Sequence, residues 1–311
     1  MNALLFPGQG SQVVGMAKEF YDKFEVVKKI FNKADQKLNF RLSKIILEGP
    51  SEQLQLTKNT QPAILTVSYS IFKVLKDEFN FKPDFKFFAG HSLGEYSALV
   101  CSNSLDFSDA IYLLHQRGIA MQEAVPVGQG SMVAVLGSKI DLIKDLINSM
   151  KEEGACEIAN DNAEGQVIVS GDTIKVDIFK SLLKKNNIKS IPLKVSAPFH
   201  CSLMKSAAEN MKVKINNTTF LKPNIEIVSN VNAEPVNDQN KIKNLLIEQI
   251  FSTVKWRESL LKMSKEGIIN FVEIGPGKAL IGMVKRTIKN SNCFSINSIA
   301  DIKNLEDGFK K

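Results

Sequence analysis

The chain has 311 residues, of which 44% are hydrophobic and 23% charged, and its formal net charge is +7. These values are typical of a globular protein with a buried core, and they exclude a disordered or fibrous chain. The 40 basic residues are scattered, without interleaved aromatic side chains or a known nucleic-acid motif, so we expect no nucleic-acid partner.

The cysteines and the N-terminus limit the class of protein further. Four cysteines lie far apart in the sequence and form no Cys-x-x-Cys pair. They therefore predict neither a metal site nor a disulfide framework, and they suit a reducing compartment. The apolar run at residues 1–6 ends at Pro-Gly and is too short for a signal peptide or a membrane span. We expect a cytoplasmic protein without a metal and without a membrane segment.

Strands and helices alternate in the first part of the chain. Residues 3–6 are a short apolar run that stops at the glycine-rich segment 7–10. Apolar side chains recur at helical spacing over 61–79, and 85–89 is a second buried strand followed by a helix over 93–101. A strand, a sharp turn and a helix in this order predict an α/β fold with a parallel sheet.

The middle of the chain has a different order of elements. Expected strands are 131–136, 155–159, 166–170 and 189–195, expected helices are 139–151 and 173–186, and a polar turn is expected at 160–165. The order β-α-β-β-α-β is the ferredoxin-like pattern. We predict a ferredoxin-like subdomain over 127–196, inserted into a large domain formed by 1–126 and 197–311. Further strands (225–228, 268–274) and helices (241–250, 278–288) are expected in the large domain.

The strongest local motif is the segment 90–94, which reads GHSLG. It has the form Gly-x-Ser-x-Gly and lies between an expected strand and an expected helix, which is the context of a nucleophile elbow. The glycines allow a close approach of neighbouring backbones, and the N-terminus of the helix favours a developing oxyanion. We predict that Ser92 is a nucleophile.

A serine nucleophile needs a base, and the chain has only His91, His115 and His200. His91 adjoins the nucleophile on a tight turn, so its side chain is expected to point away. His115 lies within an expected helix. His200 follows an expected strand, in a loop, and is the base by elimination. Either Glu273 or a backbone carbonyl is expected to orient the imidazole.

Arg117 and the loop after the first strand are further candidates. Arg117 is either a solvated helix residue or a buried guanidinium that selects a substrate with a free carboxylate. The segment 6–12, FPGQGSQ, lacks the Lys-Ser/Thr pair of a phosphate-binding loop. Its backbone can instead donate an N–H group to an oxyanion.

Several motifs together resemble the malonyl-CoA:acyl-carrier-protein transacylases of type II fatty acid synthesis. In chain order these are 6–12 (FPGQGSQ), 90–98 (GHSLGEYSA), 116–118 (QRG), 197–200 (APFH) and 272–277 (VEIGPG). They cover nearly the whole chain in the order of the family, which is far more specific than the serine motif alone. The resemblance implies an α/β-hydrolase-like core with an inserted ferredoxin-like subdomain.

The resemblance also implies roles for single residues. Ser92 is the nucleophile and His200 the base, Arg117 binds the malonyl carboxylate, and the backbone N–H groups of Gln9 and Leu93 form the oxyanion hole. Gln249 matches the family position whose backbone carbonyl orients the histidine. Malonyl-CoA is the substrate, an acidic acyl carrier protein is the partner, and no cofactor is implied. Basic side chains near the expected groove between the domains, such as Lys194 and Lys285 or Arg286, are candidates for its docking on the basis of charge.

The chain departs from the family in one place. The family often shows Asn-Pro-Val-x-Trp after the glutamine, whereas this chain has Ser252-Thr253-Val254-Lys255-Trp256. The loss of the proline bears on the local backbone path and so on the role of Gln249. Two other functions share parts of the pattern: a thioesterase or lipase-like hydrolase, and an acyltransferase-like module that only binds carrier proteins.

Overall fold

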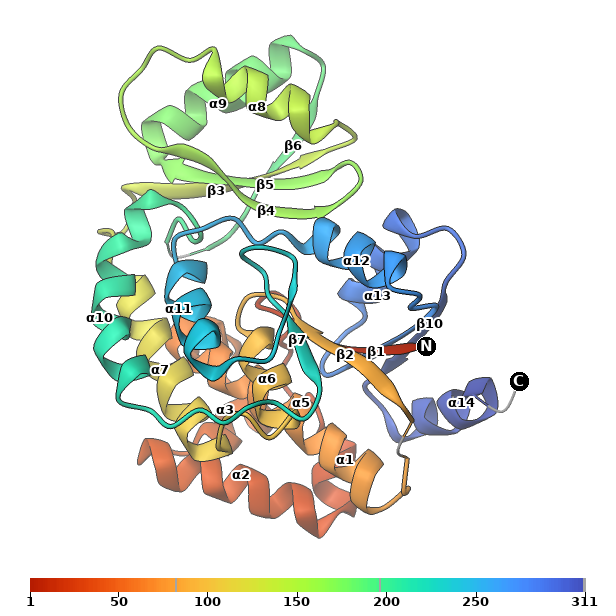
Figure 1. Cartoon of the computed structure of the whole chain (residues 1–311). Coiled ribbons are helices and arrows are strands. Elements are labelled where there is room, and N and C mark those ends of the chain that lie inside the picture. The colour runs from red at the N-terminus through yellow and green to blue at the C-terminus, as the bar shows by residue number, and fades with distance from the viewer. Residues whose placement is uncertain (82, 196, 310–311) are drawn as a thin grey trace.

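Two β-sheets organise the chain (Figure 1). The computed structural model describes residues 1–81, 83–195 and 197–309. The predicted subdomain boundary at residue 196 and the last two residues of the predicted large domain therefore lie outside the described residues. The α/β fold and its parallel-rich sheet are confirmed.

The larger sheet has six strands in the order β10-β9-β1-β2-β7-β8. All neighbouring strands pair in parallel except β8, which pairs antiparallel with β7. The strands are β1 Asn2–Phe6, β2 Phe85–Gly90, β7 Glu226–Val228, β8 Pro235–Val236, β9 Asn270–Ile274 and β10 Asn292–Ile296. The central strand β1 lies between β2 and β9, so the apolar run at the N-terminus is buried on both faces.

Successive side chains of β1 point to opposite faces of this sheet and enter two different cores. Leu4 and Phe6 pack in the larger core, whereas Ala3 and Leu5 pack in a second core. The larger core contains side chains of α1 Lys18–Lys23, α2 Glu25–Leu38, α3 Leu42–Glu48, α4 Ser51–Gln55, α5 Thr57–Asp77, α6 Gly94–Cys101, α7 Phe107–Glu123, α10 Lys205–Asn216, α11 Gln239–Gln249 and α14 Ile299–Phe309. The second contains those of α12 Trp256–Lys265 and α13 Ala279–Thr287, and a short 3₁₀ helix, η1 Ser202–Met204, precedes α10.

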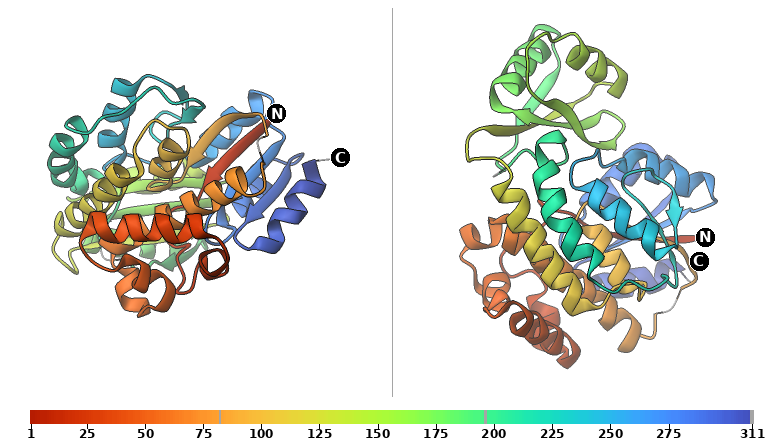
Figure 2. Two further views of the ribbon diagram at one scale, coloured as in Figure 1. Left: turned by 90° about the horizontal axis from the view of Figure 1, so that it is seen from below. Right: turned by 60° about the vertical axis from the view of Figure 1, so that its left-hand side comes forward.

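The smaller sheet is antiparallel and has the order β4-β5-β3-β6. Its elements are β3 Gly130–Leu136, α8 Ile140–Asn148, β4 Cys156–Ala163, β5 Gln166–Asp172, α9 Thr173–Lys185 and β6 Lys189–Pro192. Both helices lie on the outer face of this sheet, and its other face is turned toward the larger part of the molecule (Figures 1 and 2). The element order is the one that the sequence predicts.

One expectation in this region is wrong. The polar segment at 160–163 belongs to β4 and is not a turn; only Glu164 and Gly165 turn the chain. Polar residues are tolerated in this buried strand because side chains from the larger part of the molecule satisfy them. Arg257 binds the carboxylate of Asp161, and His91 bonds with Asn162.

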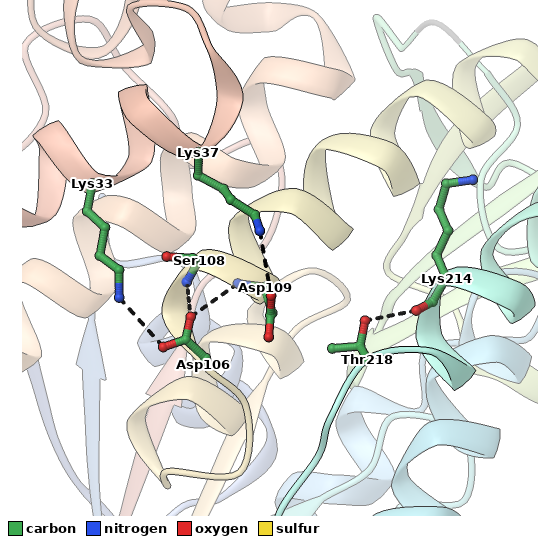
Figure 3. Close-up of polar contacts among 7 residues, drawn as sticks. All are labelled: Lys33, Lys37, Asp106, Ser108, Asp109, Lys214 and Thr218. Carbon is green, nitrogen blue, oxygen red and sulfur yellow. Dashed lines mark hydrogen bonds and ion pairs between the residues drawn. The ribbon is translucent and has the colours of Figure 1, made fainter.

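The start of α7 is defined by a capping residue. Asp106 accepts hydrogen bonds from the backbone N–H groups of Ser108 and Asp109 through its side chain. Lys33 and Lys37 of α2 reach Asp106 and Asp109, at 3.6 and 3.7 Å (Figure 3). These exposed ion pairs contribute little stability, but the cap sets where α7 begins and therefore where its later turns, with Arg117, lie.

Candidate active site

Ser92 lies on a sharp turn between β2 and α6. Its backbone has a φ of 53°, in the left-handed region that non-glycine residues rarely adopt. A Cβ at position 90 would lie 1.9 Å from the backbone of Gly94, and one at position 94 would lie 2.3 Å from the carbonyl oxygen of Phe6. Both glycines are therefore needed for this turn, as the sequence predicts.

Asn230 binds the turn from both sides and was not predicted from the sequence. Its side-chain oxygen accepts the backbone N–H of Ser92 at 2.7 Å, and its Nδ2 donates to the carbonyl oxygen of Gly90 at 2.8 Å. Asn230 follows β7, which pairs with β2. The sequence did contain a signal for Asn230, because it is a polar residue shortly after a buried strand. Folds with parallel sheets place their sites at the carboxyl-terminal ends of the strands.

His200 is the histidine that meets the serine. Its Nε2 lies 2.8 Å from Ser92 Oγ, and its Nδ1 lies 2.8 Å from the backbone oxygen of Gln249. A carbonyl oxygen only accepts, so Nδ1 carries the proton and Nε2 presents its lone pair to the serine hydroxyl. Burial, with a second contribution from Arg117, lowers the pKa of His200 to about 3, so the imidazole is neutral near pH 7.

The other candidate bases and the candidate acid lie elsewhere. His91 is half-buried and its Nε2 bonds with Asn162, while Nδ1 of His115 bonds with the backbone oxygen of Lys58. Glu273 accepts the N–H groups of Leu280 and Ile281 at the start of α13. Glu273 is thus used by a helix N-terminus, and the backbone carbonyl alternative is the one that the geometry supports.

Arg117 is the buried alternative of the two that the sequence left open. Its side chain is 1% exposed, and its Nη2 lies 3.2 Å from Ser92 Oγ. The same nitrogen donates to Gln249 Oε1 at 2.9 Å, and Nη1 donates to Gln61 Oε1 at 2.7 Å. Its Nε has no hydrogen-bond partner among the described residues. A buried guanidinium with spare donor capacity next to a serine hydroxyl is suited to bind an anionic group.

A cavity of about 270 Å³ opens beside these groups. It is bounded by the carboxyl-terminal ends of β1 and β2 on one side and by the smaller sheet on the other. Its wall includes Ser92, Arg117 and His200, together with Gln9 and Leu93; its apolar lining comes from Met121, Met132, Ile168, Leu193, Val195, Phe199, Leu280 and Met283. The structure thus brings the predicted residues of the oxyanion hole to the same cavity as the serine.

The segment that departs from the family lies against the smaller sheet. The N–H of Val254 donates to the oxygen of Ala159, and its own oxygen accepts the N–H of Asp161. Thr253 adds a bond from its hydroxyl to the oxygen of Ile158, at 2.6 Å. The backbone of Gln249 nevertheless reaches His200, so the loss of the proline does not prevent this contact.

The described ranges contain neither a metal-binding cluster nor a helix that could span a membrane. No group of three or more His, Cys, Asp or Glu among these residues is placed to hold a metal ion. No helix in the described part of the chain combines the length and the apolar character needed to cross a bilayer.

Comparison with known proteins shows the family of the chain. The sequence model of the acyl transferase domain matches residues 3–310. The chain belongs to the acyl transferase domain family. A relative from Bacillus subtilis (strain 168), a malonyl CoA-acyl carrier protein transacylase, is 43% identical over 297 residues, covering 95% of this chain and 93% of the relative.

Solved structures match this chain over nearly its whole length. An acyl carrier protein S-malonyltransferase from Vibrio cholerae matches with a TM-score of 0.95 and 37% identity, over 98% of this chain and 99% of that chain. A malonyl-transacylase in complex with its type II PKS acyl-carrier protein matches with a TM-score of 0.95 and 34% identity, over 99% of this chain and 99% of that chain. The chain is therefore an enzyme of the acyltransferase class.

Proposed function

We propose that this protein transfers a malonyl group from malonyl-CoA to the phosphopantetheine thiol of an acyl carrier protein, through a malonyl-serine intermediate. The observation that carries the proposal is the buried guanidinium of Arg117, 3.2 Å from the hydroxyl of Ser92. A cation beside the nucleophile favours an acyl group that has its own carboxylate. The relatives named above are malonyl transferases, which supports the same substrate.

In the first half-reaction, Ser92 Oγ attacks the thioester carbonyl while its proton passes to His200 Nε2. The negative charge on the carbonyl oxygen is stabilised by the backbone N–H groups of Gln9 and Leu93. The C–S bond then breaks, the thiolate of coenzyme A takes the proton from His200, and the malonyl group remains as an ester on Ser92. Arg117 holds the malonyl carboxylate throughout.

In the second half-reaction the carrier thiol follows the reverse route. The thiol gives its proton to His200 and attacks the ester carbonyl, and the C–O bond to Ser92 breaks. His200 returns the proton to Ser92 Oγ, which restores the free enzyme. The backbone oxygen of Gln249 keeps the imidazole in the tautomer that both steps need, so the site works as a dyad.

The carrier protein is acidic in this family, and the chain has a surplus of basic residues. Lys194, Lys285 and Arg286 are exposed, and Arg286 donates to Gln166 of the smaller sheet at 3.0 Å. Arg286 therefore lies where the two sheet regions meet. The positive charge of these side chains raises the rate of association with an acidic carrier.

Finer features of the protein belong to the same proposal. The larger region, 1–126 with 197–311, is an α/β-hydrolase-like catalytic domain, and 127–196 is an inserted ferredoxin-like subdomain. The four-stranded antiparallel order β4-β5-β3-β6 with two helices supports the second part. The enzyme acts in the cytoplasm and uses malonyl-CoA as a substrate, without a resident cofactor.

The decisive experiment measures the intact mass of the protein after brief exposure to malonyl-CoA. The parent is expected to gain one malonyl group, which added carrier protein removes, and Ser92→Ala is expected to gain none. Ser11→Ala is the matched control, because it removes another hydroxyl that lines the cavity and it should keep the adduct. Release of coenzyme A without an adduct would indicate a hydrolase, and neither release nor adduct would indicate a binding module; both outcomes contradict the proposal.

A further inference from the structure

Glu95 is a buried carboxyl group that the mechanism above does not use. It lies on α6, three residues after the nucleophile, and its side chain is 2% exposed. An ionised carboxylate in such a place is costly unless hydrogen bonds and an opposite charge compensate it. Its partners therefore indicate what it does.

The partners of Glu95 belong to the active site. Its Oε2 accepts the side-chain Nε2 of Gln249 at 2.8 Å and the backbone N–H of Asn230 at 3.1 Å. The Nε2 of Gln249 also faces the backbone oxygen of Ser92 at 3.1 Å and the side-chain oxygen of Asn230 at 3.3 Å. Three acceptors surround this nitrogen, so the amide of Gln249 has only one satisfactory orientation.

That orientation turns Gln249 Oε1 toward Arg117. The backbone oxygen of the same residue accepts from His200. One residue thus contacts both the guanidinium and the base, and the carboxyl group of Glu95 holds it in place. Asn230, the second partner, also binds the turn of Ser92.

Glu95 is also the carboxyl group that acts electrostatically on Arg117. The charged and titratable groups around this cluster are Arg117 on α7, Tyr96 next to Glu95 on α6, and His200, which in turn faces Arg117. Burial raises the pKa of Glu95 to about 7, although its hydrogen bonds and Arg117 oppose the rise. A carboxyl group balanced in this way changes its charge when a neighbouring charge is added.

We propose that Glu95 is a positioning residue and the proton-linked counter-charge of Arg117: it balances the guanidinium in the free enzyme and takes up a proton when a substrate carboxylate binds there. This inference rests on the proposed function, in which Arg117 receives the malonyl carboxylate. The proton comes from solvent, and the carboxylate of Glu95 becomes a carboxylic acid. Two anions sharing one buried cation repel each other, and protonation of Glu95 removes that repulsion.

Both protonation states keep the hydrogen bonds, since the carbonyl oxygen of a carboxylic acid also accepts. The positioning of Gln249 therefore persists while the charge changes. The affinity for a substrate with a carboxylate should fall as pH rises through about 7, because binding then requires uptake of a proton. The affinity for a neutral acyl group should not depend on this group.

The test compares malonyl-CoA with acetyl-CoA in the parent and in Glu95→Gln between pH 6 and pH 9. A glutamine at this position retains an acceptor oxygen and loses the charge. In the parent, the ratio of the KM for malonyl-CoA to that for acetyl-CoA should rise several-fold over this range, up to about tenfold per pH unit above the pKa. In Glu95→Gln the ratio should stay constant.

Glu273→Gln is the matched control, because Glu273 is a second buried carboxyl group whose burial raises its pKa to about 7. It binds the N-terminus of α13, and the control should keep the pH dependence of the parent. If the parent shows no pH dependence of the ratio, or if Glu95→Gln keeps it, the counter-charge role is wrong.

A direct measurement of the proton uses binding alone. Calorimetry of malonyl-CoA binding to Ser92→Ala, in two buffers of different ionisation enthalpy, should show proton uptake near pH 7. Ser92→Ala with Glu95→Gln should show none, and uptake in both proteins would overturn the proposal. The proposed function is decided by a different measurement: it is wrong if the parent forms no malonyl adduct.

The positioning role has its own variant. Glu95→Ala removes the acceptor, and it should lower kcat for malonyl-CoA and acetyl-CoA alike, by about tenfold or more, because both substrates need the His200 contact. Glu95→Gln should restore most of this kcat. An equal loss of kcat in the two variants would show that the charge, and not the positioning, is what matters.

Discussion

Ser92 and His200 share an unusual backbone conformation, and their side chains lie 2.8 Å apart. Their φ angles are 53° and 59°, so both belong to the left-handed region. Such conformations persist only where the surroundings hold them. Asn230 holds the turn of Ser92, and Ser170 of β5 donates its hydroxyl to the oxygen of Phe199, next to His200. The dyad is therefore held from the larger sheet on one side and from the smaller sheet on the other.

Arg117→Ala is expected to change substrate preference more than general activity. The buried guanidinium contacts Ser92 Oγ, and its removal takes away the partner of the substrate carboxylate. The kcat/KM for malonyl-CoA should fall by about 10²-fold or more, and that for acetyl-CoA much less. Steady-state kinetics with both substrates measure this. Equal losses of kcat/KM for both substrates in Arg117→Ala would contradict a carboxylate-binding role. Arg117→Lys is a companion variant that keeps the charge but not the two-pronged geometry.

Asn230→Ala should impair the nucleophile without touching the substrate. The variant leaves the N–H of Ser92 and the oxygen of Gly90 without their partner in a buried turn. We expect a loss of about 1–3 kcal/mol in the free energy of unfolding and a lower kcat. Asn232→Ala in the same loop is the control, since Asn232 only accepts the N–H of Glu234. Denaturant unfolding and the rate of acylation are measured, and an unchanged acylation rate would refute this role.

Glu273→Gln is expected to make the stability less dependent on pH. Burial raises the pKa of Glu273 from 4.5 to about 7, so the folded state binds more protons than the unfolded state between these values. The stability from this group is fully present below pH 4.5 and is lost as pH rises through 7. The parent should lose on the order of 3 kcal/mol from this group between pH 4.5 and pH 8, and the variant should not. Thermal unfolding of both proteins at pH 5 and pH 8 tests this, and parallel pH profiles would contradict it.

Thr253→Val tests the contact at the position where the family often has proline. The hydroxyl of Thr253 donates to the oxygen of Ile158 in β4, and valine has the same shape without the donor. We expect a loss of about 0.5–1.5 kcal/mol in the free energy of unfolding. Hydrogen exchange should be faster at Asp161, whose N–H bonds with Val254. If exchange in β4 does not change, Thr253 does not fasten the smaller sheet.

Features that depend on neighbours in the sequence were predictable. The motif of Gly90, Ser92 and Gly94 predicted the turn, because the close backbone approach that requires glycine arises between a strand and the helix that follows it. The strand and helix periods also predicted the parallel sheet and the order of elements in the smaller one. The error at 160–163 arose because polar residues in a buried strand look like a turn until their distant partners are known.

Features that depend on contacts between distant segments were decided only by the tertiary structure. The sequence left Arg117 as either solvated or buried, and left Glu273 and a backbone carbonyl as alternatives for His200. Burial of α7 against its neighbours decides the first, and the position of the end of α11 decides the second. The sequence assigned no role to Glu95 or Asn230, since the bonds that join Asn230 to Glu95 and to Gly90 each span more than 130 residues of the chain. The local sequence thus determined the nucleophile and its turn, while the packing of remote helices determined the charges and hydrogen bonds around it, because these depend on distances that no sequence spacing fixes.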